Sequence, residues 1–82
     1  MNKPNIEYPC TWSYKIIGSD RKLIPQNVRI ILENYEYTFR PSKKSTTGKY
    51  VSFHCSVKVE SEEERNRIFV MLQNIPTVKM VL

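Results

Sequence analysis

The sequence is poor in the residues and patterns on which most catalytic, metal-binding and membrane functions depend. It holds one histidine and two cysteines, and Cys10 and Cys55 lie too far apart in the sequence for metal-ligand spacing. It has no run of about 18 apolar residues and no basic start followed by an apolar stretch, which argues against a membrane span and a signal peptide. No Walker spacing occurs, which argues against an NTPase. We therefore expect a cytoplasmic protein with free thiols.

The single histidine, His54, lacks the neighbours that a catalytic residue needs. Ser52 and Ser56 flank it, so a nucleophile with a base can be imagined. However, no carboxylate is placed to orient the imidazole, and no glycines follow that would form an oxyanion hole. The sequence therefore predicts no enzyme, no metal site and no cofactor.

Length and charge allow one small basic domain. The 82 residues are 40% hydrophobic, enough for a single core, and carry a net charge of +5. Half of the acidic residues fall within 60–64, so the rest of the chain has few acidic residues to offset its basic ones. Such a charge attracts nucleic acid, acidic proteins or anionic metabolites, and it also keeps a protein soluble.

Alternation of apolar and polar residues predicts four strands. The clearest covers 49–59, where the inward residues are Val51, Phe53, Cys55, Val57 and Val59. Other strands are expected at 12–17, 37–42 and 77–82. In the last of these, the alternation directs Val78, Met80 and Leu82 inward and Lys79 outward.

Two helices are predicted from apolar residues that recur with helical spacing. The first covers about 22–34 and should begin near Leu23, because Pro25 is tolerated only in the first turn. The second begins at Glu62, because Ser61 and Glu64 form a capping box, and Pro76 stops it.

The resulting order, β-α-β-β-α-β, is that of an α+β ferredoxin-like fold. Right-handed crossovers place both helices on one face of a four-stranded antiparallel sheet, with the first and third strands central. Pro41 fits this arrangement because the second strand lies at an edge. We expect residues 1–9 to be a flexible arm and 10–82 to form the single domain.

The sheet face without helices, together with the loop at 43–48, is the predicted binding surface. Its candidate residues are Lys15, Arg40, Ser42, Lys43, Lys44, Lys49, Tyr50, Ser52 and His54. Basic and hydroxyl side chains of this kind suit a carboxylate or phosphate group, although a merely solvated hairpin would have the same composition.

Two functions fit this surface. The first is a regulatory or binding domain, monomeric or weakly dimeric, that takes a protein partner or a small anion. The second is an RNA-binding module, since ferredoxin-like sheets with exposed rings bind RNA. The stretch Tyr50-Val51-Ser52-Phe53 resembles part of the RNP1 pattern, but Gly48 is followed by Lys49 and Tyr50 where that pattern needs an aromatic and a small residue. The sequence identifies neither the ligand nor the pathway.

Several stretches resemble the YbeD-like family of small bacterial proteins of unknown function. They are Tyr8-Pro9, Tyr14-Lys15-Ile16-Ile17-Gly18, Arg40-Pro41-Ser42, Gly48-Lys49-Tyr50-Val51-Ser52 and Val78-Lys79-Met80-Val81-Leu82. The resemblance covers most of the chain. It implies a ferredoxin-like fold similar to the ACT domains that sense small molecules, and it implies no assigned activity.

Overall fold

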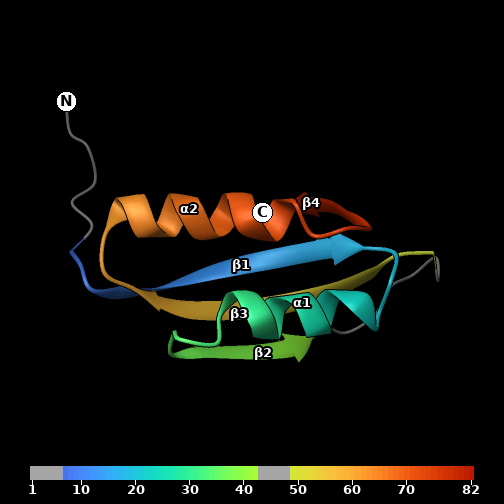
Figure 1. The fold of residues 1–82 in the computed structure, drawn as a ribbon, viewed down its shortest axis with the longest axis horizontal. Helices are drawn as coiled ribbons and strands as arrows, with labels where there is room; N and C mark the ends of the chain where they lie inside the picture. Colours follow the sequence, from blue (N-terminus) through green and yellow to red (C-terminus); the bar gives the residue numbers. More distant parts are fainter. Residues whose placement is uncertain (1–6, 43–48) are drawn as a thin grey trace.

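A computed structural model describes residues 7–42 and 49–82 of the chain, and Figure 1 shows its six elements. In chain order they are β1 (Cys10–Gly18), α1 (Leu23–Ile31), β2 (Tyr37–Pro41), β3 (Val51–Val59), α2 (Glu62–Gln73) and β4 (Val78–Val81). This is the predicted β-α-β-β-α-β order. The predicted loop residues Lys43 and Lys44 lie outside the described ranges, as do residues 1–6 of the predicted arm.

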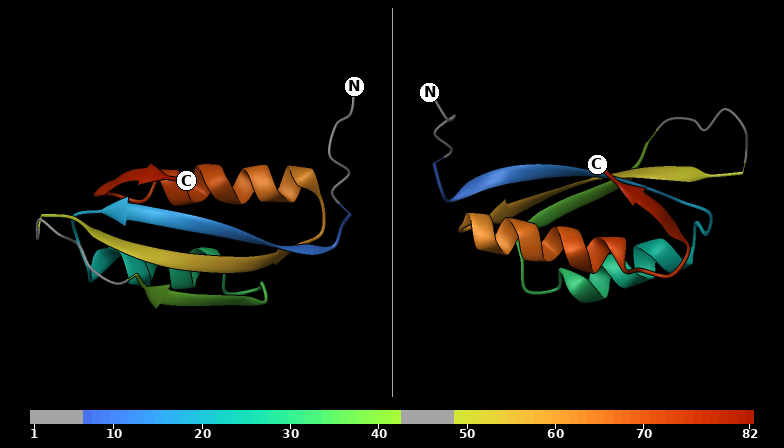
Figure 2. Two further views of the ribbon diagram at one scale, coloured as in Figure 1. Left: turned by 180° about the vertical axis from the view of Figure 1, so that it is seen from behind. Right: turned by 90° about the horizontal axis from the view of Figure 1, so that it is seen from above.

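The strands form one antiparallel sheet in the order β2-β3-β1-β4, so the predicted central and edge positions are confirmed. Both helices lie on the same face, as the right-hand view of Figure 2 shows. β1 pairs with β3 along its whole length, from Cys10 opposite Val59 to Gly18 opposite Val51. The other face of the sheet carries no helix, and we call it the open face.

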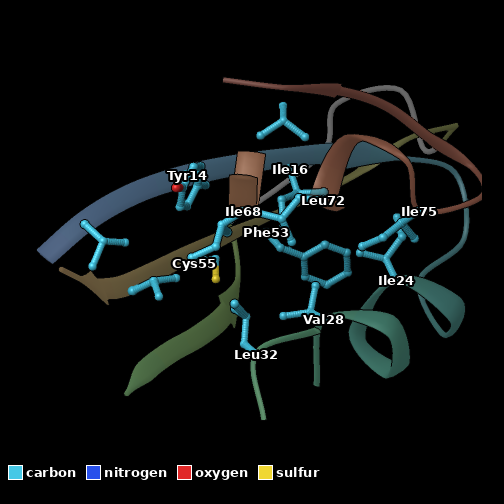
Figure 3. Packing of buried hydrophobic residues seen from close by; sticks show 13 residues of the cluster. Tyr14, Ile16, Ile24, Val28, Leu32, Phe53, Cys55, Ile68, Leu72 and Ile75 are labelled. Carbon is cyan, nitrogen blue, oxygen red and sulfur yellow. The ribbon is translucent and has the colours of Figure 1, made fainter. Parts of the chain in front are cut away.

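β3 is buried on one side as its alternation predicts. Phe53, Cys55, Val57 and Val59 are at most 5% exposed. Figure 3 shows how the core closes around this strand, with side chains from Ile16 of β1, Ile24 and Val28 of α1, and Ile68 and Leu72 of α2. Burial raises the pKa of the Cys55 thiol to about 12, so this cysteine is a core residue.

Side-chain caps determine where the two helices begin. The Asp20 carboxylate accepts the N–H groups of Lys22 and Leu23 at 2.9 and 2.8 Å, and these bonds hold its pKa below the ordinary value. Ser61 Oγ accepts the Glu64 N–H at 3.1 Å, as predicted for the capping box, and the returning bond runs from the Glu60 N–H to Glu64 Oε1 at 2.7 Å, one residue before the position that the motif predicts. α1 ends at Ile31, earlier than the predicted residue 34.

The predicted alternation of the last strand is wrong after Val78. Val81 is the buried residue, 6% exposed and opposite Ile16, whereas Met80 and Leu82 are 45% and 64% exposed. The cause is a register shift in which Ile17 faces Met80 but Gly18 faces Val78, leaving Lys79 as an extra residue. One extra residue exchanges the two faces of a strand.

Gly18 lies at this register shift and has no room for a side chain. A Cβ atom there would stand 2.6 Å from Ile24 Cδ1 and 2.6 Å from the Thr77 carbonyl oxygen. Thr77 itself has a φ of 73°, a conformation that costs energy for a β-branched residue. The turn into β4 therefore packs directly against the end of β1.

We predict that Gly18→Ala destabilises the protein by about 1–3 kcal/mol, because the methyl group must displace Ile24 or the backbone at Thr77. Urea unfolding monitored by circular dichroism measures the change. Ser19→Ala, at the exposed neighbouring position, serves as the control and should leave the unfolding midpoint unchanged. Equal midpoints for Gly18→Ala and the control would contradict the close packing described above.

Candidate functional site

Three of the predicted site residues form a row across the open face. His54 of β3 lies opposite Lys15 of β1 on one side and opposite Arg40 of β2 on the other. Directly opposed residues in antiparallel strands have Cβ atoms about 4.5–5.5 Å apart. We call these three residues the basic row, and it is continuous over three strands.

The basic row has no acidic partner within residues 7–42 and 49–82. Neither Lys15 nor Arg40 forms an ion pair there, whereas Lys58 lies 3.9 Å from Glu36 and Arg65 lies 3.7 Å from Glu62. Arg40 and His54 are exposed, and Lys15 is half-buried. The guanidinium and ammonium groups are therefore available to an anion from solvent.

Hydroxyl groups flank the basic row on both sides. On one side, the Ser42 N–H donates to the Ser52 carbonyl oxygen at 2.9 Å, which places Ser42, just after β2, beside Ser52 of β3. On the other side, Ser13 Oγ and Ser56 Oγ lie 3.2 Å apart. Serine hydroxyls can donate to a carboxylate or phosphate group held by the row.

The remaining predicted site residues lie further from the row or outside the described part. Tyr50 lies just before β3, is 38% exposed, and has Lys79 Nζ 5.9 Å from its ring centroid. Lys49 precedes it and is exposed. The contribution of Lys43 and Lys44 stays a prediction, because both lie outside the described ranges.

The open face offers little aromatic surface. Phe39 and Phe53 stack on each other with ring centroids 5.0 Å apart, but they lie on the helix-covered side, where Phe53 is buried. In residues 7–42 and 49–82, Tyr50 is the only aromatic residue that the strand alternation directs to the open face. RNA-recognition sheets stack two or three bases on such rings.

The prediction from sequence missed a cluster around Arg65 on the helix-covered side. The Arg65 guanidinium lies 4.3 Å from the centroid of the Trp12 ring, and its Nη1 donates to Tyr8 Oη at 3.3 Å. Tyr14 Oη donates to the Arg65 carbonyl oxygen at 2.7 Å, and burial raises the pKa of this tyrosine to about 12. A search for apolar residues on the second helix overlooks an arginine whose stem packs inward.

A family model described as "Protein of unknown function (DUF493)" matches residues 3–82 of the chain. The chain belongs to this family. The resemblance to YbeD-like proteins is thereby confirmed, since relatives carry the name UPF0250 protein. One of these, from Hahella chejuensis, is 31% identical over 83 residues, covering 96% of this chain and 91% of the relative.

Other relatives come from Helicobacter and Campylobacter. An uncharacterized protein of Helicobacter pylori strain 26695 is 34% identical over 82 residues, covering 98% of this chain and 93% of the relative. Uncharacterized protein Cj0253 of Campylobacter jejuni is 37% identical over 71 residues, which cover 87% of this chain and 82% of the relative. The solution structure of HP0495 from Helicobacter pylori has a TM-score of 0.83 at 28% identity, with 98% of this chain and 88% of that chain covered.

These findings support the fold and the family, and the family description gives no activity. Neither described helix is long and apolar enough to cross a membrane. The open face of this chain is therefore the feature that bears on its function.

We predict that Tyr14 makes stability fall as the pH rises from 10 to 12. An unfolded tyrosine loses its proton near pH 10, whereas Tyr14 in the folded protein retains it up to about pH 12. The neutral phenol therefore stabilises the folded state fully below pH 10, and this contribution is lost at higher pH. Tyr14→Phe should cost about 1 kcal/mol at neutral pH and less near pH 12.

Urea midpoints of the wild-type protein and of Tyr14→Phe at pH 9 and pH 11.5 test this. Tyr50→Phe is the matched control, because the Tyr50 side chain is exposed. The raised pKa of Cys55 also lowers the stability as the pH rises. Because Cys55 is present in all three proteins, its effect cancels when their urea midpoints are compared. A constant difference between wild type and Tyr14→Phe at both pH values would contradict the prediction.

Proposed function

We propose that this domain is a non-enzymatic, regulatory binding module that receives an acidic segment of a partner protein on the open face of its sheet. The observation that carries the proposal is the basic row, Lys15, His54 and Arg40, with no acidic partner in the described part of the chain. We also propose a cytoplasmic location and a monomeric or weakly dimeric state, and the two free thiols agree with the first.

The arrangement of the basic row supports this reading because its two cations have no opposite charge across the strands. The residue directly opposite both Lys15 and Arg40 is His54, and neither cation forms an ion pair in the described part of the chain. Opposite charges paired across two strands stabilise a sheet, and this sheet lacks that contribution at Lys15 and Arg40. An acidic ligand would supply the missing opposite charge.

The chemistry of the row suits carboxylates. Arg40 can hold a carboxylate through two parallel N–H donors, Lys15 adds a point charge, and the nearby serine hydroxyls can donate to the remaining oxygens. His54 lies between the two cations, and no carboxylate bonds to its ring within the described residues. This geometry supports an anion-binding role for His54 and argues against general-base chemistry.

RNA binding is the alternative from another class. The basic row would attract a phosphate backbone as well as carboxylates. Tyr50 is the single aromatic ring on the open face within the described ranges, which argues against RNA binding, because base stacking supplies much of the affinity for single strands. The test of the proposal therefore includes RNA as one arm.

The probe is a 12-residue peptide of glutamate and serine, titrated into labelled protein at about 20 mM salt, where the Debye length of roughly 20 Å leaves exposed charges only partly screened. We expect amide shifts centred on the basic row. Lys15→Glu combined with Arg40→Glu should weaken binding at least tenfold, equivalent to about 1.4 kcal/mol.

The matched control is Arg21→Glu combined with Arg67→Glu, which makes the same change in net charge at exposed positions off the open face. If both double variants lose affinity equally, only the total charge attracts the peptide, and the basic row is not the site. If mixed-sequence single-stranded RNA binds more tightly than the peptide at 150 mM salt and shifts Tyr50, RNA binding replaces the proposal.

A further inference from the structure

Over the first half of β1, no strand within residues 7–42 and 49–82 pairs with its outer edge. β4 pairs with β1 only at Ile16, Ile17 and Gly18, followed by two backbone bonds between Lys15 and Leu82. From Cys10 to Tyr14, no described strand lies on this side of β1. Figures 1 and 2 show β1 continuing well past the end of β4.

The direction of the backbone groups along this edge follows from the bonds at Lys15. Its N–H donates to the Leu82 carbonyl oxygen at 3.1 Å, and its carbonyl oxygen accepts the Leu82 N–H at 2.8 Å. Backbone groups on a strand alternate between its two sides with a period of two residues. The N–H and C=O groups of Ser13 and Thr11 therefore point to the same outer edge, in line with β4.

The opposite edge of the sheet, on β2, is closed to pairing at its last residue. The Ser42 N–H bonds to Ser52 on β3, so the alternation turns the backbone of Pro41 outward, together with those of Tyr37 and Phe39. Proline has no N–H to donate, so an added strand could pair at Tyr37 and Phe39 but not fully at Pro41. Between Cys10 and Tyr14, β1 contains no proline.

A groove lies beside the open edge, between β1 and α2. It has a volume of about 300 Å³ and is lined by Trp12, Tyr14, Arg65, Asn66, Phe69 and Leu82. The rings of Trp12 and Phe69 give it an apolar floor. On the open face, the same edge carries different side chains, the hydroxyls of Thr11 and Ser13 and the ammonium group of Lys15.

We propose that an extended peptide adds to β1 as a new strand at Thr11 and Ser13, continuing the line of β4. Its side chains would alternate, with apolar residues entering the groove and acidic residues facing Lys15 on the open face. The acidic half of this pattern rests on the proposed function, whereas the backbone pairing and the groove do not. The partner is thus a segment of alternating apolar and acidic residues.

A second copy of the chain fits this edge less well than such a peptide. Two copies each carry a net charge of +5 and repel, while an acidic peptide is attracted. The open stretch is short, and a stable dimer needs about 1,200 Å² or more of buried surface in total. A peptide needs only the edge and the groove.

The test uses an acetylated eight-residue peptide of alternating valine and glutamate and the wild-type protein. Amide hydrogen exchange measured by NMR should slow at least tenfold at Thr11 and Ser13 when the peptide is saturating, because their N–H groups become hydrogen-bonded. The control peptide has the same composition, with the four valines followed by the four glutamates. It should bind the basic row without slowing exchange at Thr11 and Ser13.

Two further variants test the backbone pairing. Ser13→Pro removes an N–H that no bond within the described sheet uses, and it should abolish the binding of the alternating peptide, while Ser13→Ala should retain it. Because proline at this position can disturb folding, the valine–glutamate peptide methylated at alternate backbone nitrogens provides the same test with unaltered protein. Full affinity of the methylated peptide would overturn strand addition.

The outcomes separate this inference from the proposed function. If the alternating peptide shifts the basic row but leaves exchange at Thr11 and Ser13 unchanged, strand addition is wrong and the proposed function stands. If exchange slows equally in Lys15→Glu combined with Arg40→Glu, strand addition stands and the acidic preference fails. If exchange slows with rising protein concentration in the absence of peptide and the sedimenting mass doubles, a second copy is the occupant and the peptide proposal is overturned.

Discussion

The pairing of β1 with β3 is the constraint on which the other features of this molecule depend. It runs over all nine residues of each strand without a break, from Cys10 opposite Val59 to Gly18 opposite Val51. On the helix-covered side it builds the core around Ile16 and Cys55. On the open face the same register places Lys15 opposite His54. A slip of one residue would exchange the two faces, so the core and the basic row are specified together.

Contacts at Gly18 determine how the chain enters β4. Gly18 packs directly on the Thr77 carbonyl and Ile24, which brings the turn against the end of β1. The extra residue at Lys79 then exchanges the faces of β4, burying Val81 and exposing Met80. The first half of the outer edge of β1 has no partner in the described part of the chain. The packing at Gly18 thus determines where β4 begins along β1 and which of its residues are buried.

Periodicity was sufficient to predict the six elements and their order, because the apolar positions of β3 and the cap at Ser61 each agree with a single local structure. It failed for β4, where Val78, Met80, Val81 and Leu82 are all apolar and the alternation is nearly uninformative. There the face is decided by a bulge, which depends on contacts at Gly18 that are distant in sequence. Tertiary packing, and not the local sequence pattern, determines which residues of β4 are buried.

The candidate site likewise could be predicted in part from the sequence and in part only from the fold. The sequence predicts that Lys15, Arg40 and His54 share the open face, because the period of two alone determines that. It does not predict that they lie directly opposite one another, since register also depends on the lengths of the connections between strands. The Arg65 cluster was missed for a related reason. Its partners Tyr8 and Trp12 are more than fifty residues away in the chain, and only the fold brings them together.

An unpaired strand edge is normally a liability, because it offers backbone hydrogen bonds to any other strand. Here Pro41 closes the last position of the β2 edge, whereas Thr11 and Ser13 leave the edge of β1 able to pair. Charge adds selectivity at the β1 edge. Lys15 stands at the end of the open stretch on the open face, so a strand carrying cations there is repelled and one carrying acids is attracted. The basic row and the open edge meet at Lys15, whose side chain belongs to the row while its backbone bonds end the pairing with β4. A single acidic strand paired with β1 would therefore contact both surfaces at Lys15.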